Sequence, residues 1–444
     1  MILFLENQSF DSVLGFWCRS RPARCPVGGM PKSVTLSNGA VVQPKDNPDV
    51  VPNVNHSITS QLKAMHIVNG VPQMNGWENL VAGSCNANSG YRCISGYKPN
   101  QEPNLSRLAL RFAISDDTFT LADSPSWGGH LNIVTSNMDG FPGNVPKRVP
   151  GVKSGTGWGC DSNRVTPWAS SLGGTLQSVP SCIPDPKLTY HGSPLPNGGA
   201  FEPTPVKYEP TIMDELKSAH LSWKFYSGSC TDESVASNGL KTCTKEDGGY
   251  SWAICPSIAQ CLYTQTHHIA DPDTFMKDAS AGTLPSFSII TPAGNHVADS
   301  EHNGFSMTAG DDWVGQIASS LMNGPDWDSS ALFITWDDCG CFYDQAKPEV
   351  NPDGTQQGLR APLVIVSPYV RPEYTDSTAT TFAGILAYTE HNFGLAPLSV
   401  NDENAYGYAN AFNYAQKPLG PIPMVKRPVP RGDHIHWWEG REDT

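Results

Sequence analysis

The fold is decided by the stretch ALFITWDDCGCFYD, which runs from Ala331 to Asp344. It begins as a continuous run of apolar, β-branched and aromatic residues, a pattern typical of a buried parallel strand. The run ends at two adjacent carboxylates, Asp337 and Asp338. Ligands of open α/β sheets collect outside the carboxyl ends of strands, and buried paired carboxylates need a cation or a shared proton, so the pair predicts a metal site. The alternative is a helix N-cap, with Asp338 as the cap and Asp337 as its solvated neighbour.

A second stretch near the start of the chain repeats this pattern. The apolar run from Ile2 to Leu5 predicts a short buried strand, and Glu6 and Asn7 follow it directly. Two strand ends of this kind can converge at one edge of a parallel sheet. Three carboxylates and an amide oxygen would then form a hard, oxygen-rich site suited to a divalent cation. A helix cap remains the alternative for Glu6 and Asn7 as well.

The rest of the chain alternates expected strands with expected helices, and hairpin signals are few. Expected helices cover residues 56–65, 104–112, 126–134, 212–219, 313–322 and 381–389, and expected strands cover 113–119, 223–226, 287–290 and 362–367. A length prior of ~150 residues per domain would allow about three domains. The alternation instead predicts one α/β domain over residues 1–444, with a mostly parallel sheet. Residues 139–205 are expected to form a loop excursion, and residues 418–444 a wrapping C-terminal extension.

Composition limits the classes of partner. The chain has 444 residues, of which 38 are Pro and 41 are Gly, so long loops are expected on the sheet. Its formal net charge is -14 with 29 Lys and Arg, and no basic cluster is present. Nucleic-acid binding needs a basic face and is therefore excluded as a function. An anionic substrate would need a localised cation, which gives mild support to a metal.

The cysteines indicate an exported protein. There are 12, an even number, in close pairs: Cys18/Cys25, Cys85/Cys93, Cys160/Cys182, Cys230/Cys243, Cys255/Cys261 and Cys339/Cys341. Sequence does not fix connectivity, so these pairings are hypotheses. A secreted or periplasmic protein with disulfides is the better interpretation. No signal peptide is visible, so we expect the chain to lack its leader or to start late. No apolar run approaches the ~20 residues of a membrane span, so no integral membrane segment is expected.

A serine lies at the expected start of a helix. Ser126 stands in the turn Ser-Trp-Gly-Gly-His, where helix N–H groups and the helix dipole would favour a nucleophile that attacks phosphorus. The alternative is that Ser126 is only an N-cap, and Ser124 is the rival nucleophile. No G-x-S-x-G motif occurs, which disfavours a serine esterase of the α/β-hydrolase type.

Several histidines could act on the substrate. His302, His56 and one member of the pair His267 and His268 could stabilise phosphoryl oxygens or protonate a leaving group. For the adjacent pair the alternative is ordinary loop packing. His296 belongs to the same histidine-rich region, and His434 and His436 are expected to belong to the C-terminal tail. Trp127, Trp336 and Tyr343 could line a pocket, but aromatic residues at strand ends are more often part of the core.

Taken together, these segments resemble the phosphoesterase family that includes bacterial non-haemolytic phospholipases C and a class of acid phosphatases. Six segments match the family's motifs in order: Glu6 to Asp11, His56-Ser57 with Met74 to Gly76, Ser126 to His130, Glu301-His302, Thr335 to Asp344, and Arg360 to Val370. The resemblance covers nearly the whole chain. It implies an alkaline-phosphatase-like α/β sandwich with a central, mostly parallel sheet flanked by helices.

The resemblance also implies roles. The implied metal ligands are Glu6, Asn7, Asp337 and Asp338, and the implied catalytic residues are Ser126 as nucleophile with His56, His267, His268 and His302. The implied cofactor is one or more divalent metal ions of the Ca, Zn or Mg/Mn class. The implied substrate is a phosphate ester, either a phospholipid or a small phosphomonoester. The family's phospholipases tend to carry threonine at the nucleophile position, so Ser126 favours the phosphatase-like side.

This chain departs from the family pattern at four positions. Gly129 stands where the family usually has Asn, and Gln345 stands where the family often has His. Asn303 stands where the family often has Pro after the histidine that corresponds to His302, and Cys341 stands where the family has Gly. The prediction is a metal-dependent phosphoesterase that acts through a phosphoserine intermediate at Ser126. The alternative is a catalytically inactive, disulfide-rich binding protein on the same scaffold.

Overall fold

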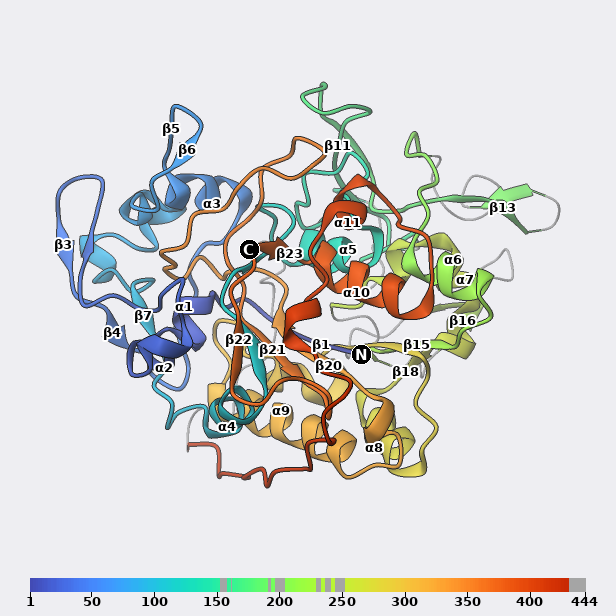
Figure 1. Cartoon of the computed structure of the whole chain (residues 1–444). Coiled ribbons are helices and arrows are strands. Elements are labelled where there is room, and N and C mark those ends of the chain that lie inside the picture. Colours follow the sequence, from blue (N-terminus) through green and yellow to red (C-terminus); the bar gives the residue numbers. More distant parts are fainter. Residues whose placement is uncertain are drawn as a thin grey trace.

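An eight-stranded sheet lies at the centre of the chain (Figure 1). The computed structural model describes residues 1–151, 158–160, 162–190, 193–195, 204–228, 233–235, 241–243 and 252–430. The sheet order is β18 (Ile269–Ala270), β15 (Trp223–Tyr226), β19 (Phe287–Ile290), β1 (Ile2–Leu5), β20 (Leu332–Trp336), β21 (Leu363–Val366), β8 (Ala113–Ser115) and β22 (Tyr374–Asp376).

The sheet is mostly parallel, as predicted. The strands β18, β15, β19, β1 and β20 pair with their neighbours in parallel. Strand β21 is antiparallel to both β20 and β8, and β22 is parallel to β8, so β21 alone in this sheet runs in the opposite direction. Strands β1 and β20 are buried along their whole length, because their continuous apolar runs face covering layers on both sides of the sheet.

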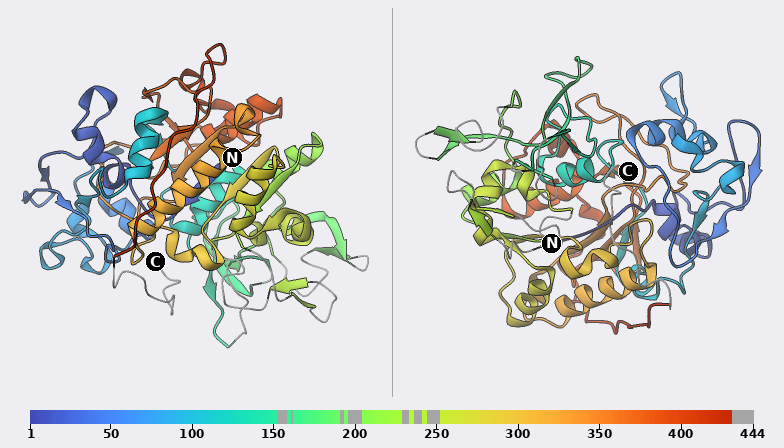
Figure 2. Two further views of the ribbon diagram at one scale, coloured as in Figure 1. Left: turned by 90° about the horizontal axis from the view of Figure 1, so that it is seen from below. Right: turned by 180° about the vertical axis from the view of Figure 1, so that it is seen from behind.

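Helices cover both faces of the sheet (Figures 1 and 2). They are α1 (Phe10–Val13), α2 (Gly15–Arg19), α3 (Ile58–Met65), α4 (Pro103–Arg111), α5 (Ser126–Thr135), α6 (Ile212–Ser218), α7 (Ala259–His268), α8 (Pro272–Ala281), α9 (Met307–Met322), α10 (Ala383–Phe393) and α11 (Val400–Asn404). The α/β class is therefore confirmed. In the described part of the chain, no helix combines the length and the apolar character that crossing a membrane requires.

Small hairpins and short strands decorate this sandwich. Their bounds are β2 (Val34–Thr35), β3 (Val41–Val42), β4 (Lys45–Asp46), β5 (Ile67–Val68), β6 (Val71–Pro72), β7 (Ser95–Gly96), β9 (Thr118–Phe119), β10 (Lys147–Arg148), β11 (Arg164–Trp168), β12 (Gln177–Pro180), β13 (Asp185–Tyr190), β14 (Ser193–Leu195), β16 (Glu233–Val235), β17 (Lys241–Cys243) and β23 (Thr380–Thr381). None of the described strands between residues 139 and 205 joins the central sheet.

Four of the expected disulfides are confirmed: Cys18–Cys25, Cys85–Cys93, Cys160–Cys182 and Cys255–Cys261. Cys230 and the side chain of Cys243 lie outside the described residues, so their pairing stays a prediction. The pairing of Cys339 with Cys341 is wrong, because both are buried free thiols. Gly340 and Cys341 have left-handed backbone conformations, and the Cys341 N–H donates a hydrogen bond to Cys339 Sγ at 3.1 Å, so the turn holds the two thiols as hydrogen-bonded neighbours.

The last described segment, residues 418–430, packs along α4 and α9. Arg427 forms salt bridges with Asp311 and Asp312 at the start of α9. Asn104 in α4 donates a hydrogen bond to the Val425 carbonyl at 2.8 Å and accepts one from the Val425 N–H at 2.7 Å. His434 and His436 lie outside the described residues.

Candidate active site

Two strand ends bring four polar side chains together. In the central sheet β1 pairs in parallel with β20, so that Leu5 lies opposite Trp336. Glu6 and Asn7 therefore lie beside Asp337 and Asp338. The Asn7 N–H donates a hydrogen bond to Asp337 Oδ1 at 2.8 Å, and all four residues are fully buried. The predicted convergence of the two strand ends is present in the structure.

Neither pair of strand-end residues caps a helix. The N-cap of α1 is Ser9, whose side chain accepts from the Ser12 N–H. Asp338 Oδ1 accepts a hydrogen bond from the Gly340 N–H at 2.6 Å, which closes a tight turn, and no helix begins within the turn. The cap interpretation is therefore excluded for both pairs, and their burial needs another explanation.

Helix α5 presents two further side chains to this cluster. Ser126 and His130 are four residues apart, so they lie on the same face of the helix. The Ser126 hydroxyl lies 3.2 Å from the Asn7 amide group, and His130 Nε2 lies 2.8 Å from Glu6 Oε1. The N-cap of α5 is Pro125, so Ser126 is not the cap. Instead its hydroxyl lies at the positive end of the helix dipole and faces the carboxylate cluster.

Gly129 allows this close approach. A Cβ atom at position 129 would lie 2.3 Å from the Asp337 carbonyl oxygen. Because any side chain at this position would push α5 away from the strand end, glycine is required by the packing of the site. The departure at position 129 therefore adapts the helix to its neighbour.

Gly129→Ala is expected to destabilise the protein by about 2 kcal/mol, although alanine favours helices, because the added methyl group overpacks the contact with Asp337. It should also lower catalytic turnover, because Ser126 and His130 move with the helix. Thermal unfolding and an activity assay measure both effects. Gly420→Ala is the control, since nothing lies within 4 Å of its added Cβ. Equal stability of the two variants would contradict the packing argument.

The electrostatics of the cluster call for a cation. Burial, together with repulsion from Asp337, raises the pKa of Glu6 and of Asp338 well above the usual range. Burial also raises the pKa of Asp337 and lowers the pKa of His130 to about 3, so this histidine is neutral. In the described part of the chain, no lysine or arginine forms a salt bridge with these three carboxylates.

The donor atoms fit a divalent metal ion. One ligand atom each from Glu6, His130 and Asp337 lie within 4.8 Å of one another. Glu6 Oε2 is buried and has no hydrogen-bond partner. The side-chain amide of Asn7 has two possible orientations. In one of them its oxygen points toward the carboxylates of Asp337 and Asp338, as the oxygen of a ligand around a cation would. In the reverse orientation this oxygen accepts from His302 Nε2 at 2.8 Å. Carboxylate oxygens with one imidazole suit several divalent metals.

Two of the predicted histidines reach the site. His302 lies beside Asn7, and its Nδ1 is 3.0 Å from the Asn303 carbonyl oxygen, which directs Nε2 toward the cluster. His56 packs edge-on against His302, with 6.1 Å between the ring centroids, and its Nδ1 is 2.9 Å from the Val54 carbonyl oxygen. Trp252 stacks on the other side of His302.

His268 does not reach the site. Its ring stacks on Trp223 with 3.6 Å between centroids, at the amino-terminal end of β15. The cluster lies at the carboxyl ends of the parallel strands, so the structure does not bring His268 to it. The side chain of His267 lies outside the described residues. His296 forms salt bridges with Asp273 and Asp299.

The predicted aromatic residues belong to the core. Trp127 donates a hydrogen bond to Ser257 Oγ at 2.9 Å, and Trp336 donates one to Glu301 Oε2 at 2.9 Å. Tyr343 packs against Trp77. The hydrogen bond from Trp336 anchors Glu301, which precedes His302 and has a left-handed backbone conformation (φ 65°). Trp336 thus acts on the site indirectly, through the loop that carries His302.

Sequence reasoning missed two features of the site. The role of His130 was missed, although its spacing of four from Ser126 on a helix was the available signal. A buried ion-pair cluster behind the strand-end loops was also missed: Arg360 lies 3.0 Å from Asp344 and 3.3 Å from Asp11. Arg360 thus ties helix α1, which follows β1, to the loop after β20. Gln345 belongs to this cluster and donates a hydrogen bond to the Gly29 carbonyl at 2.7 Å.

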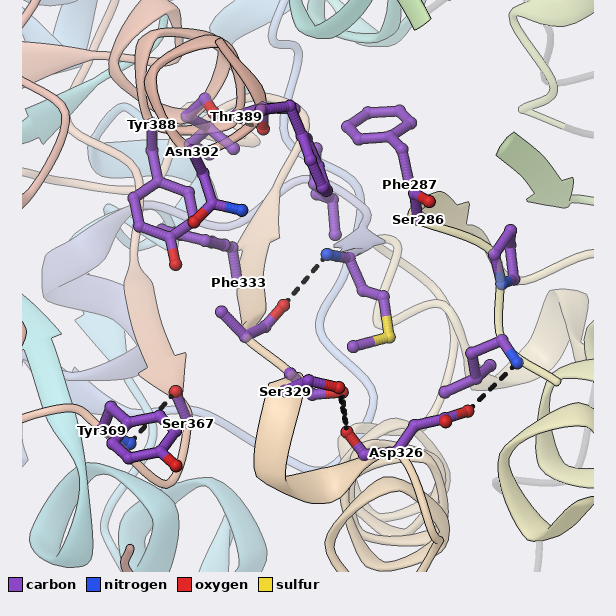
Figure 3. A pocket seen from close by; sticks show the side chains of 18 of the residues that line it. Ser286, Phe287, Asp326, Ser329, Phe333, Ser367, Tyr369, Tyr388, Thr389 and Asn392 are labelled. Atoms are coloured by element: carbon purple, nitrogen blue, oxygen red, sulfur yellow. Dashed lines mark hydrogen bonds between the residues drawn. The ribbon is translucent and has the colours of Figure 1, made fainter. Parts of the chain in front are cut away.

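A cavity of about 480 Å³ lies at the other end of the central strands (Figure 3). Its lining includes Ser286, Phe287, Asp326, Phe333 and Tyr388. Ser286 directly precedes β19, Phe287 and Phe333 lie near the amino-terminal ends of β19 and β20, Asp326 lies between α9 and β20, and Tyr388 lies in α10. None of these residues belongs to the strand-end cluster. The cavity is therefore separate from the candidate active site.

Comparisons with known proteins give a consistent picture. A model described as the Phosphoesterase family matches residues 1–396. Non-specific phospholipase C6 of Arabidopsis thaliana is 23% identical over 100% of this chain and 77% of its own length. Phospholipase C A of Mycobacterium tuberculosis is 25% identical over 49% of this chain and 46% of its own length. The chain thus spans about three quarters of the length of the first relative and less than half of the second. A solved structure described as a protein in the alkaline phosphatase superfamily, from Vibrio parahaemolyticus, matches with a TM-score of 0.33 and 12% identity, over 67% of this chain and 62% of that chain.

Proposed function

The chain belongs to the phosphoesterase family, whose members are hydrolases acting on ester bonds, and from this premise we propose that it hydrolyses phosphate esters through a phosphoserine at Ser126. The observation that carries the proposal is the position of the Ser126 hydroxyl. It lies at the start of α5, 3.2 Å from the Asn7 amide and next to three buried carboxylates.

The reaction proceeds in two displacements at phosphorus. Ser126 Oγ loses its proton and forms a bond with phosphorus, while the ester bond to the leaving alcohol breaks and that alcohol takes up a proton. Water then attacks the phosphoserine, releases the phosphate product and restores the serine hydroxyl. The dipole of α5 stabilises negative charge that develops on the phosphoryl oxygens during both steps.

Glu6, Asn7, Asp337 and His130 would hold a divalent metal ion, and Asp338 lies against them. When bound, such an ion polarises a phosphoryl oxygen and lowers the pKa of a coordinated hydroxyl. This donor set differs from the predicted one in that His130 takes the place of Asp338. The four residues position the ion beside Ser126, and Gly129 keeps α5 close enough for His130 to take part.

His302 lies beside Asn7 and His56 packs against it, and both are proposed to contact the phosphoryl oxygens or the leaving group. In each ring Nδ1 lies within hydrogen-bond distance of a backbone carbonyl, which fixes the orientation of both imidazoles. Protonation of the leaving alcohol by an imidazole in such a position contributes ~10²–10⁴-fold to the rate in other enzymes.

The substrate is proposed to be a phosphodiester of the phospholipid type. The relatives named phospholipase C support this choice, whereas serine at the nucleophile position favoured a phosphomonoester. We expect kcat/KM for p-nitrophenyl phosphorylcholine to exceed that for p-nitrophenyl phosphate by about tenfold, or ~1.4 kcal/mol in transition-state free energy. Parallel assays with the same metal-loaded preparation measure both values. A preference for the monoester would contradict the substrate class and leave the phosphoserine step standing.

Two broader predictions remain proposals. The four confirmed disulfides support export to an oxidising compartment, secreted or periplasmic. Residues 1–444 are proposed to form a single catalytic domain, supported by the pairing of β1 with β20 and by the contacts of residues 418–430 with α4 and α9. No observation favours the inactive binding protein, because the expected nucleophile, carboxylates and two histidines all lie together.

A further inference from the structure

Exposed apolar side chains gather on three projecting loops. Large apolar residues with at least a third of their surface exposed include the following seven, which we call the apolar rim: Leu62, Ile67, Val68, Val71, Leu172, Leu176 and Val350. The rim residues come from the β5–β6 hairpin with the end of α3, from the β11–β12 connection, and from the loop of residues 349–357. Figures 1 and 2 show all three segments projecting from the same side of the molecule.

The β5–β6 hairpin is built to project. Asn69 and Gly70 both have positive φ angles (51° and 77°), the turn that suits a two-residue hairpin. Nothing lies within 4 Å of a Cβ atom built on Gly70, so the tip stands clear of the rest of the chain. Val68 is 42% exposed and Val71 is 50% exposed. An isolated tip with apolar side chains gains stability only when something covers it.

The other two loops lie next to each other. A Cβ built on Gly354 would lie 4.0 Å from Leu172 Cδ2, so the loop of residues 349–357 touches the β11–β12 connection. Leu172 is 73% exposed and Val350 is 58% exposed. The rim therefore combines one separate hairpin tip with a second apolar area formed by two adjoining loops.

Each part of the rim is attached to a segment that carries the candidate active site. Helix α3 begins two residues after His56 and leads directly into the β5–β6 hairpin. In the loop of residues 349–357, Asn351 donates a hydrogen bond to the Leu121 carbonyl at 2.7 Å, five residues before Ser126. Trp168, at the end of β11, donates one to the Asp139 carbonyl at 2.7 Å, just after α5. The rim is thus mechanically connected to the residues around Ser126.

The charges around the hairpin favour an anionic or phosphate-bearing partner. The chain carries a net charge of -14, but residues 19–98 contain eight Lys or Arg against three Asp or Glu. Lys63 and His66 are exposed beside the hairpin, and β10 adds exposed cations at the base of the β11–β12 hairpin. Glu349 and Asp353 in the third loop are the opposing charges. Lys63 beside the hairpin, and Lys147 and Arg148 in β10, therefore supply positive charge near the exposed apolar side chains.

We propose that the apolar rim docks on the surface of a phospholipid bilayer, with Ile67, Val68 and Leu172 entering the interface and Lys63 facing the head groups. A bilayer accepts separated apolar tips without a matching groove, and nearby cations strengthen its binding. This inference rests on the proposed function in one respect: docking would serve to bring phospholipid esters to Ser126. It assigns a membrane-facing side to the molecule, and binding can be measured without turnover.

The test is vesicle binding by rim variants. In a Ser126→Ala background, which leaves the lipid intact, Val68→Asp with Leu172→Asp should lower affinity for vesicles of phosphatidylcholine with one fifth phosphatidylserine at least about tenfold. Leu110→Asp is the matched control, because Leu110 is 44% exposed on α4, away from the rim, and should leave binding unchanged. With Ser126 restored, the double variant should cleave p-nitrophenyl phosphorylcholine within about twofold of the unsubstituted rate and vesicle lipid at least about tenfold more slowly.

Other outcomes separate this proposal from the function on which it rests. Equal vesicle binding by the double variant and the Leu110→Asp control, or no vesicle binding by the unsubstituted chain, would overturn the docking surface. Conversion of a dimer to a monomer by the double variant, seen by size-exclusion chromatography without lipid, would also overturn it and assign the rim to self-association. Rim-dependent vesicle binding without phosphoester turnover would support docking while contradicting the proposed function.

Discussion

Replacing Ser126 with alanine is expected to lower the turnover of p-nitrophenyl phosphorylcholine at least ~10³-fold, the loss typical of a removed nucleophile. The hydroxyl is proposed to form the covalent bond to phosphorus, and no other described side chain occupies its position against Asn7. Steady-state kinetics measure the loss. Elemental analysis of the same preparation should show unchanged metal content, because Ser126 is not among the proposed ligands.

Ser124→Ala is the matched control for this experiment. Ser124 is also buried, lies two residues earlier and has a hydroxyl with no hydrogen-bond partner. We expect this variant to retain at least about half of the turnover, since its hydroxyl has no contact with the carboxylate cluster. A large loss in Ser124→Ala with full activity in Ser126→Ala would transfer the nucleophile to position 124. Rapid quenching with labelled substrate should trap the phosphoserine only when Ser126 is present.

The second large effect is expected from Asp337→Asn. This change removes one of the three carboxylates, so metal content should fall below one tenth of the unsubstituted value and turnover should fall ~10²–10³-fold. The effect of this substitution on the free energy of unfolding should have opposite signs without metal and with metal. Without metal, the variant should be as stable as the unsubstituted chain or more stable, because a charge that repels Glu6 and Asp338 has gone. With metal in excess, it should lose the gain of about 2.7 kcal/mol that a ligand provides at 100 times its Kd.

Thermal unfolding with and without a chelator measures this difference. Asp312→Asn is the control, because it changes a buried carboxylate that pairs with Arg427 and is not among the proposed ligands. Its response to the chelator should match that of the unsubstituted chain. If the chelator leaves the melting temperature and the turnover of the unsubstituted protein unchanged, the metal assignment fails, and the three carboxylates would need to share protons instead.

The sequence predicted the ends of the central strands well, for a physical reason. A strand buried on both faces must be a continuous apolar run, so polar residues mark its end, as at Glu6 and Asp337. Strand direction is not encoded in such a run, which explains why the antiparallel β21 was not foreseen. His268 was misplaced because adjacent histidines give no directional signal. His130 was missed because a helical histidine looks like core until its neighbour Glu6 is known.

The position of β1 in the sheet has a consequence for how the protein forms. β1 pairs with β19 and β20, and the contact between Asn7 and Asp337 joins residues 330 positions apart. Pairings of such long range form slowly, because the chain must close a very large loop before it gains the contact. During synthesis, β1 must remain without its partners until most of the chain has emerged. Assembly of the active site is therefore expected to be a late folding event, and fragments that end before β20 should acquire neither metal nor activity.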